Sequence, residues 1–236
     1  MAIIAKSTGE STQKELIPAG TYVARLYSIV HLGHVTQKYL GEEKQVNLVR
    51  FTFELPTELK CFNQDKGMQP CAISKEMTLS LNEKSNLRQF INSWRGKALS
   101  EKEAEAFDLE KLLGQPCMLN LIHQASKSNP EKVYERIAAV MPMMKGMTCP
   151  PQHNPTMAFT VDEFDRPKFE SLPTFLQEMI VGSTEYKQMI SRPVSASAPA
   201  APTPAQQQEM LYAQHQQQQQ PPANPDLQEE FDELPF

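Results

Sequence analysis

Residues that could carry out catalysis or hold a metal are few in this chain. The sequence contains no glycine-rich phosphate loop, no hydrolase-type serine motif and no His-Glu-x-x-His motif. Cys149 and His153 are separated by three residues, which suits half a zinc site, whereas nine residues separate Cys61 from Cys71. Structural zinc sites draw their ligands from two close pairs. We therefore expect no enzyme, no cofactor and no metal, and a zinc-stabilised adaptor stays an alternative that metal analysis would test.

The last nine residues, QEEFDELPF, combine the features of a peptide ligand. Phe236 offers an apolar ring and a free carboxylate, and acidic side chains precede it. A partner with an apolar pocket beside Arg or Lys side chains could bind the ring and the carboxylates together. We expect this protein-interaction tip to consist of Asp232, Glu233, Leu234, Pro235 and Phe236.

Basic and aromatic side chains recur on predicted strands and in the loops that join them. Proteins bind single-stranded nucleic acids with positive charges along the backbone and with aromatic rings on which bases stack. The alternative is that Tyr27 and Tyr134 are ordinary strand residues and that the basic side chains are only solvated. The candidate nucleic-acid-binding residues are Arg25, Tyr27, Lys38, Tyr39, Lys44, Arg50, Lys127, Lys132, Tyr134 and Arg136.

The elements that must position these side chains follow from the spacing of apolar residues. In the first predicted strand, Leu26 and Val30 are expected on the buried face, and Arg25 and Tyr27 on the opposite face. Pro56 is expected to end the second strand. Alternation with a period of two predicts strands at residues 17–33, 46–55, 73–81, 116–124 and 132–141.

Helical spacing replaces this alternation between the third and fourth strands. Residues 84–97 carry apolar side chains, Trp94 among them, three and four residues apart. Residues 100–114 begin with Ser100 and Glu103, which are spaced as a capping box. Five short strands with a helical insertion after the third are the layout of an OB-fold β-barrel, a mainly β domain that often binds oligonucleotides.

The chain divides into four predicted regions. Residues 1–148 form the OB-fold nucleic-acid-binding domain, and residues 149–190 form a small helical extension that packs on the barrel or on another subunit. The extension holds one helical pattern near residues 172–190. Residues 191–225 are a Pro/Ala/Gln-rich linker, expected to be disordered because it lacks the apolar surface for a core. Residues 226–236 contain the acidic tip.

The net charge of −5 is distributed unevenly. Residues 191–236 contain one basic and six acidic side chains, which leaves 22 of each in residues 1–190. This asymmetry is typical of an acidic interaction tail, and the neutral remainder leads us to expect several subunits sharing one strand. Four irregularly spaced Cys predict a reducing cytoplasm, and no apolar run is long enough for a membrane span.

The tip resembles the C-terminal tip of bacterial single-stranded-DNA-binding proteins, which are OB-fold proteins with Gln/Pro/Gly-rich linkers. Pro235 and Phe236 match its Pro-Phe end, and Asp232 and Glu233 match its acids in kind. Leu234 stands where Ile is usual. The resemblance implies that the tip recruits replication and repair proteins.

The predicted barrel resembles a bacteriophage and prophage family of replication or single-stranded-DNA-binding proteins. The likeness implies a non-enzymatic protein that coats single strands in the cytoplasm of a bacterial host during replication or recombination. A strand-annealing recombination protein or mediator is the alternative, and faster annealing of complementary oligonucleotides would identify it. The stretches that carry the likeness are IPAGTYVARLYSIVHLG, VRFTFELP, ISKEMTLSLNEKSNLRQFINSWRGK and LLGQPCMLNLIHQ.

Overall fold

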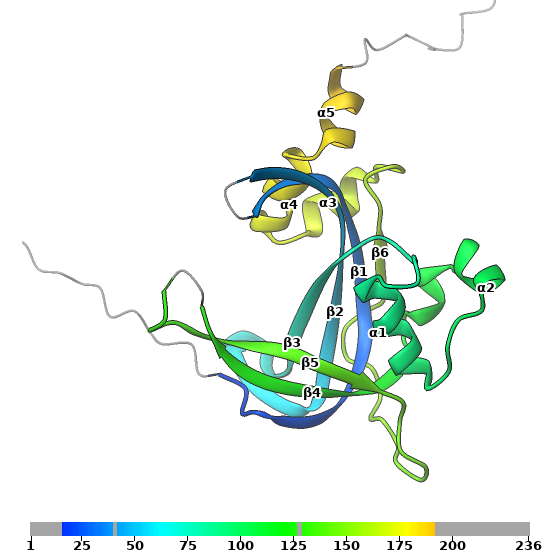
Figure 1. Ribbon diagram of the computed structural model, residues 1–236. Helices are drawn as coiled ribbons and strands as arrows, with labels where there is room; N and C mark the ends of the chain where they lie inside the picture. Colours follow the sequence, from blue (N-terminus) through cyan, green and yellow to red (C-terminus); the bar gives the residue numbers. More distant parts are fainter. Residues whose placement is uncertain (1–15, 40–41, 127–128, 192–236) are drawn as a thin grey trace, which may run out of the picture. The chain divides into compact units, whose positions relative to one another are not determined.

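Five antiparallel strands form a curled sheet in the computed structural model, which describes residues 16–39, 42–126 and 129–191 (Figure 1). The strand order is β3-β2-β1-β4-β5, and the curl brings β3 and β5 near each other without pairing them. The sheet is therefore a half-barrel, which confirms the predicted mainly β class. The strands are β1 (Gly20–Tyr39), β2 (Glu42–Asn63), β3 (Gly67–Thr78), β4 (Pro116–Ala125) and β5 (Val133–Met141).

Helices follow β3 and β5 in the chain, and the helical insertion between β3 and β4 is confirmed (Figure 1). No helix of the described residues has the length and apolar character needed to cross a membrane. The insertion holds α1 (Asn86–Arg95), α2 (Glu101–Glu105) and the 3-10 turn η2 (Leu109–Leu112). After β5 come the short strand β6 (Met157–Phe159) and the helices α3 (Arg166–Ser171), α4 (Thr174–Val181) and α5 (Thr184–Ser191).

The main hydrophobic core lies between the inner face of the half-barrel and α1. Phe53 packs against Phe90 and Trp94, with ring centroids 6.2 and 5.5 Å apart. The indole N–H of Trp94 donates to the carbonyl of Pro116 at 3.1 Å, which fixes α1 against the start of β4. Burial of this apolar face stabilises the helix, since ten residues are too few to be helical alone in water.

The pairing of β1 with β2 shifts by one residue between Leu26 and Ser28. Before this β-bulge, Ala24 and Leu26 face the main core, as the alternation predicted. After it, Val30 belongs to a second core on the outer face, so its predicted place beside Leu26 is wrong. The inserted residue, Tyr27, reverses the alternation, a change that apolar spacing alone does not reveal because both faces are buried here.

The prediction that Pro56 ends the second strand is also wrong. β2 continues to Asn63, and its pairing with β3 is irregular between Leu55 and Leu59. This irregularity accommodates Pro56, which has no N–H to donate to a sheet ladder. The strand therefore extends into the β2–β3 hairpin, which closes through a 3-10 turn at Gln64–Lys66.

The predicted capping box of α2 is confirmed, because Ser100 accepts from the Glu103 N–H and the Glu103 carboxylate accepts from the Ser100 N–H. The single helix predicted near residues 172–190 is instead two helices, α4 and α5. Ser183 separates them: its hydroxyl donates to the carbonyl of Ile180 at 2.6 Å and accepts from the N–H of Tyr186. Serine favours such helix starts over helix interiors.

Residues 149–191 pack on the outer face of β1 and β2. β6 pairs with β1 in parallel, and Leu176 and Ile180 of α4 pack in the second core. The fully buried carboxylate of Glu54 accepts from the backbone N–H groups of His153 and Asn154 at 3.0 and 2.9 Å. It also accepts from the side-chain amide of Asn154 at 2.8 Å. One carboxylate of β2 thus satisfies three donors of the extension.

Replacing Glu54 by Ala should lower the free energy of unfolding by roughly 2–4 kcal/mol, because three partly buried donors lose their buried acceptor. Urea unfolding followed by circular dichroism measures this change. Glu42→Ala, an exposed carboxylate on the same strand, is the matched control and should shift stability by less than about 0.5 kcal/mol. Equal midpoints for Glu54→Ala and the unaltered protein would contradict the structural role of these contacts.

Candidate nucleic-acid interface

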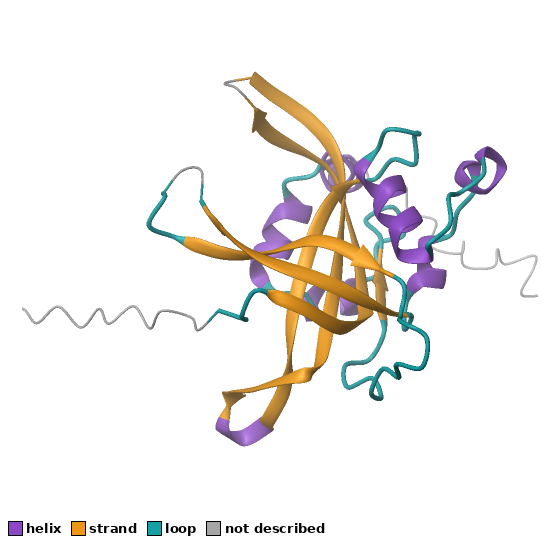
Figure 2. Ribbon diagram, turned by 60° about the horizontal axis from the view of Figure 1, so that its bottom comes forward, coloured by secondary structure: helices purple, strands orange, loops and turns teal. Residues whose placement is uncertain are grey.

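A groove of about 640 Å³ follows the gap where β3 and β5 approach without pairing. Residues 74–78 of β3 form one wall, and residues 134–137 of β5 form the other. Gln37 of the β1–β2 hairpin and Gln124 of the β4–β5 hairpin also line it. Both hairpins project from the sheet (Figure 2). We call this surface the β3–β5 groove.

Lys75 lies in the inward phase of β3, between the buried residues Ile73 and Met77. Its ammonium group donates to the carbonyl of Ile137 at 2.9 Å, which links β3 to β5 across the gap. The same group lies 5.3 Å from the centroid of the Phe90 ring. Burial lowers the pKa of Lys75, and the positive charge of Arg136 lowers it further. The groove therefore contains a partly desolvated positive charge.

Tyr134 and Arg136 share the outward phase of β5, and both line the groove. The Tyr134 side chain is half exposed, so its ring presents a face to solvent. Arg136 donates to the side-chain carbonyl of Gln124 on the neighbouring strand at 2.6 Å. This contact holds the guanidinium on the groove wall, where its remaining N–H groups can still donate.

Arg50 of β2 lines the groove close to α4. Its guanidinium pairs with the carboxylate of Glu76 at 2.5 Å. The same guanidinium lies 5.1 Å from the centroid of the Phe175 ring, which is exposed. Arg50 is thus held between a carboxylate and an aromatic ring. Its planar guanidinium is suited to stacking on aromatic faces.

Arg25 and Tyr27 do not line the β3–β5 groove. Arg25 donates to the carbonyls of Gly114 and Pro150 at 2.7 and 3.0 Å, so its guanidinium joins segments of the fold. Tyr27 is partly buried, and its pKa is raised first by that burial and then by the charge of Glu54. The structure places both residues beside the segment that follows β5.

The remaining candidates belong to the hairpins. Lys44 and Lys132 are exposed, on the β1–β2 hairpin and at the start of the β4–β5 return. The side chains of Lys38 and Tyr39, and the whole of Lys127, lie outside the described part of the chain. The same holds for the predicted tip, Asp232, Glu233, Leu234, Pro235 and Phe236. Their roles stay predictions.

The Cys149 and His153 pair does not extend to a larger ligand set within the described residues, where no three His, Cys, Asp or Glu side chains are grouped to hold a metal. The N–H of His153 donates to Glu54. Burial raises the pKa of the Cys149 thiol, and Arg25 opposes that shift through its charge and a hydrogen bond. These contacts tie the segment to the sheet.

The sequence did not point to two residues of this region: Lys75, which lines the groove, and Phe175, which lies against the groove residue Arg50. Lys75 carries a signal in retrospect, because a lysine in the inward phase of an amphipathic strand marks a place where the barrel interior meets water. Phe175 carries no comparable signal, since its helical spacing with Leu176 and Met179 predicts a buried stripe. In the structure the ring is exposed and lies against the guanidinium of Arg50.

Comparison with known proteins adds no relationship. Neither a scan against models of protein families nor a search of curated proteins found a match to this chain. The resemblances noted in the sequence therefore stay predictions.

Replacing Arg136 by Gln should raise the pKa of Lys75 toward its ordinary value of 10.5, because the like charge that disfavours the ammonium form is removed. An NMR pH titration of lysine side chains labelled at Cε measures this shift. Lys132→Gln is the control, since Lys132 is not among the causes of the lowered pKa. An unchanged Lys75 titration in Arg136→Gln would mean that the two groups lie too far apart to interact.

Proposed function

We propose that this protein binds single-stranded DNA in the β3–β5 groove. The observation that supports the proposal best is the composition of this groove, where the half-exposed ring of Tyr134 lies beside Lys75 and Arg136. Aromatic faces and cations along one groove are what binding to a single strand requires. The groove belongs to a non-enzymatic binding protein that coats exposed strands during replication or recombination.

The strand arrangement supports an OB-fold assignment. The order β3-β2-β1-β4-β5, with β3 returning to β5, is the order of an OB-fold barrel opened at one place. The helix α1 also follows β3, as that fold requires. OB-folds bind oligonucleotides between the β1–β2 and β4–β5 loops. Here a residue of each corresponding hairpin, Gln37 and Gln124, lines the groove.

The contacts of the groove divide between bases and phosphates. Tyr134 offers a ring face to a base, and Arg50 with the neighbouring Phe175 offers a second stacking surface. Arg136 and Lys75 supply donors and positive charge for phosphates. Because every base has a π face, binding through these contacts is largely independent of sequence.

The charge of the groove limits how strongly salt should weaken binding. Arg50, Lys75 and Arg136 line it together with the carboxylates of Glu76 and Glu135, so positive charge exceeds negative charge only slightly. Two to three phosphate contacts would give a slope of log K against log salt of roughly −1.4 to −2 for a single strand. Several subunits sharing one strand would add their contacts, which suits a homo-oligomer.

The acidic tip extends the proposal to protein partners. Phe236 would insert into an apolar pocket of a replication or repair protein, while Asp232 and Glu233 meet basic side chains beside that pocket. The same acids repel DNA phosphates, so the tip does not contribute to strand binding. Groove and tip would then connect a coated strand to a partner.

Replacing Tyr134 by Ala should weaken binding of oligo-dT by roughly 1–3 kcal/mol, because one base loses its stacking surface. Fluorescence anisotropy of a labelled oligonucleotide, repeated across salt concentrations, measures the affinity. Tyr134→Phe keeps the ring and should bind like the unaltered protein. If the unaltered protein does not bind oligo-dT even at low salt, the proposed function is wrong.

Replacing Phe236 by Ala should abolish most capture of replication or repair proteins from a bacterial lysate without changing the net charge. Deletion of residues 228–236 should do the same, and affinity for oligo-dT should stay equal or rise at low salt, where repulsion by the acids is least screened. Mass spectrometry of pull-downs identifies the captured proteins. If the intact and the shortened protein capture the same proteins, the tip serves only as a solubilising segment.

A further inference from the structure

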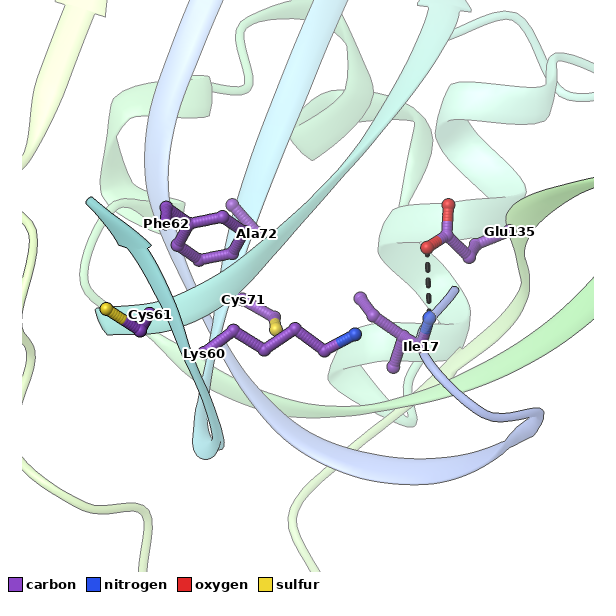
Figure 3. A pocket seen from close by; sticks show the side chains of 7 residues that line it. All are labelled: Ile17, Lys60, Cys61, Phe62, Cys71, Ala72 and Glu135. Carbon is purple, nitrogen blue, oxygen red and sulfur yellow. Dashed lines mark hydrogen bonds between the residues drawn. The ribbon is translucent and has the colours of Figure 1, made fainter. Parts of the chain in front are cut away.

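A second cavity, of about 450 Å³, lies where the β2–β3 hairpin leaves the sheet (Figure 3). We call it the hairpin pocket. Lys60 extends across it toward Ile17, and Phe62 and Glu135 stand at its sides (Figure 3). The N–H of Ile17 donates to Glu135 at 3.0 Å, which fixes both residues. The residues that line the hairpin pocket are Ile17, Lys60, Cys61, Phe62, Cys71, Ala72 and Glu135.

The hairpin pocket continues the β3–β5 groove. Glu135 lines both cavities. On the opposite wall, Cys71 and Ala72 of β3 line the pocket, and the groove begins two residues later at Ser74. A strand that follows the gap between β3 and β5 past Glu135 therefore arrives at the pocket.

Exposed aromatic rings mark this same path. Among the described residues, the large aromatic side chains that are mainly or about half exposed are Phe62, Tyr134 and Phe175, at 57%, 50% and 47%. Tyr134 lines the groove, Phe175 lies over the groove residue Arg50, and Phe62 lines the pocket. The other rings of the fold contribute largely to its cores. The three exposed rings thus supply faces on which bases could stack along this path.

We infer that the hairpin pocket binds one unstacked base of the DNA strand that occupies the β3–β5 groove. The inference rests on the proposed function and adds a subsite to it. The ring of Phe62 stacks on the base, and the side chain of Ile17 provides an apolar wall. Lys60 contributes positive charge beside the adjoining phosphate.

Glu135 gives the subsite a preference among bases. Its Oε1 accepts from Ile17, and no described residue donates to its other oxygen. That oxygen accepts well from the exocyclic amino group of cytosine or adenine, whereas thymine carries a carbonyl oxygen at the same place. The pocket therefore selects a base with an amino group, although the rest of the groove does not discriminate.

Phe62→Ala tests the stacking role in the full-length protein, with labelled oligo-dC as the probe. We expect affinity to fall roughly five-fold or more, with no change in thermal unfolding, because the ring is mainly exposed. Phe62→Tyr keeps the ring face and should bind within about two-fold of the unaltered protein. Photocrosslinking with an iodinated deoxycytidine oligonucleotide should attach DNA to the peptide that contains Phe62.

Glu135→Gln tests the base preference. The unaltered protein should bind oligo-dC more tightly than oligo-dT, and the variant should lose most of that difference. If the unaltered protein binds both oligonucleotides but Phe62→Ala binds oligo-dC equally well, the subsite is absent and the groove proposal stands. If the unaltered protein binds neither oligonucleotide, the proposed function fails together with the subsite.

Discussion

The one-residue shift in pairing at Tyr27 of β1 determines how this chain divides its apolar surface. On one side of the shift, Leu26 packs in the core beneath α1; beyond it, Val30 packs in the core beneath α4. β1 can do both because its pairing partners also change, from β4 along residues 20–25 to β6 along residues 28–30. Residues 149–191 are thus part of the same fold as the half-barrel, and they occupy an outer face that would otherwise be solvated.

Charged residues in the inward phase account for the opening between β3 and β5. Elsewhere the inner face carries side chains such as Phe51, Phe53 and Leu119. At the gap the inward positions hold Lys75 and Glu135, one on each strand. Desolvating either charge completely would cost several kcal/mol, so the two strands stay apart where water reaches both groups. The same charges that prevent closure form the floor of the candidate interface.

Much of the fold could be predicted from the sequence, because alternation and helical spacing report which faces are buried. The strands and α1 lie close to their predicted positions, and the capping box at Ser100 is present. The errors arose where another constraint overrode the pattern: the bulge at Tyr27, the irregular pairing around Pro56, and the Ser183 hydroxyl that interrupts a helix.

The candidate site was less predictable than the fold. Tyr134 and Arg136 share the outward phase of β5, and both line the groove, although their role there stays a prediction. Arg25 and Tyr27 also lie in the outward phase of their strand, but the segment that follows β5 packs on that face and covers them in part. Phe175 lies in α4, within that later segment, and contacts Arg50 only because the segment folds back onto the sheet. Contacts between distant segments depend on tertiary packing, which local periodicity does not encode.

The environment of Trp94 has a consequence for spectroscopy. It is the only tryptophan in the chain, and its ring is buried between Phe53 and Phe90 with the indole N–H bonded to Pro116. Its emission is therefore that of an apolar environment and reports whether α1 is docked on the sheet. Trp94 is not among the residues that line the β3–β5 groove, so we expect intrinsic tryptophan emission to report the integrity of the core rather than occupancy of that groove.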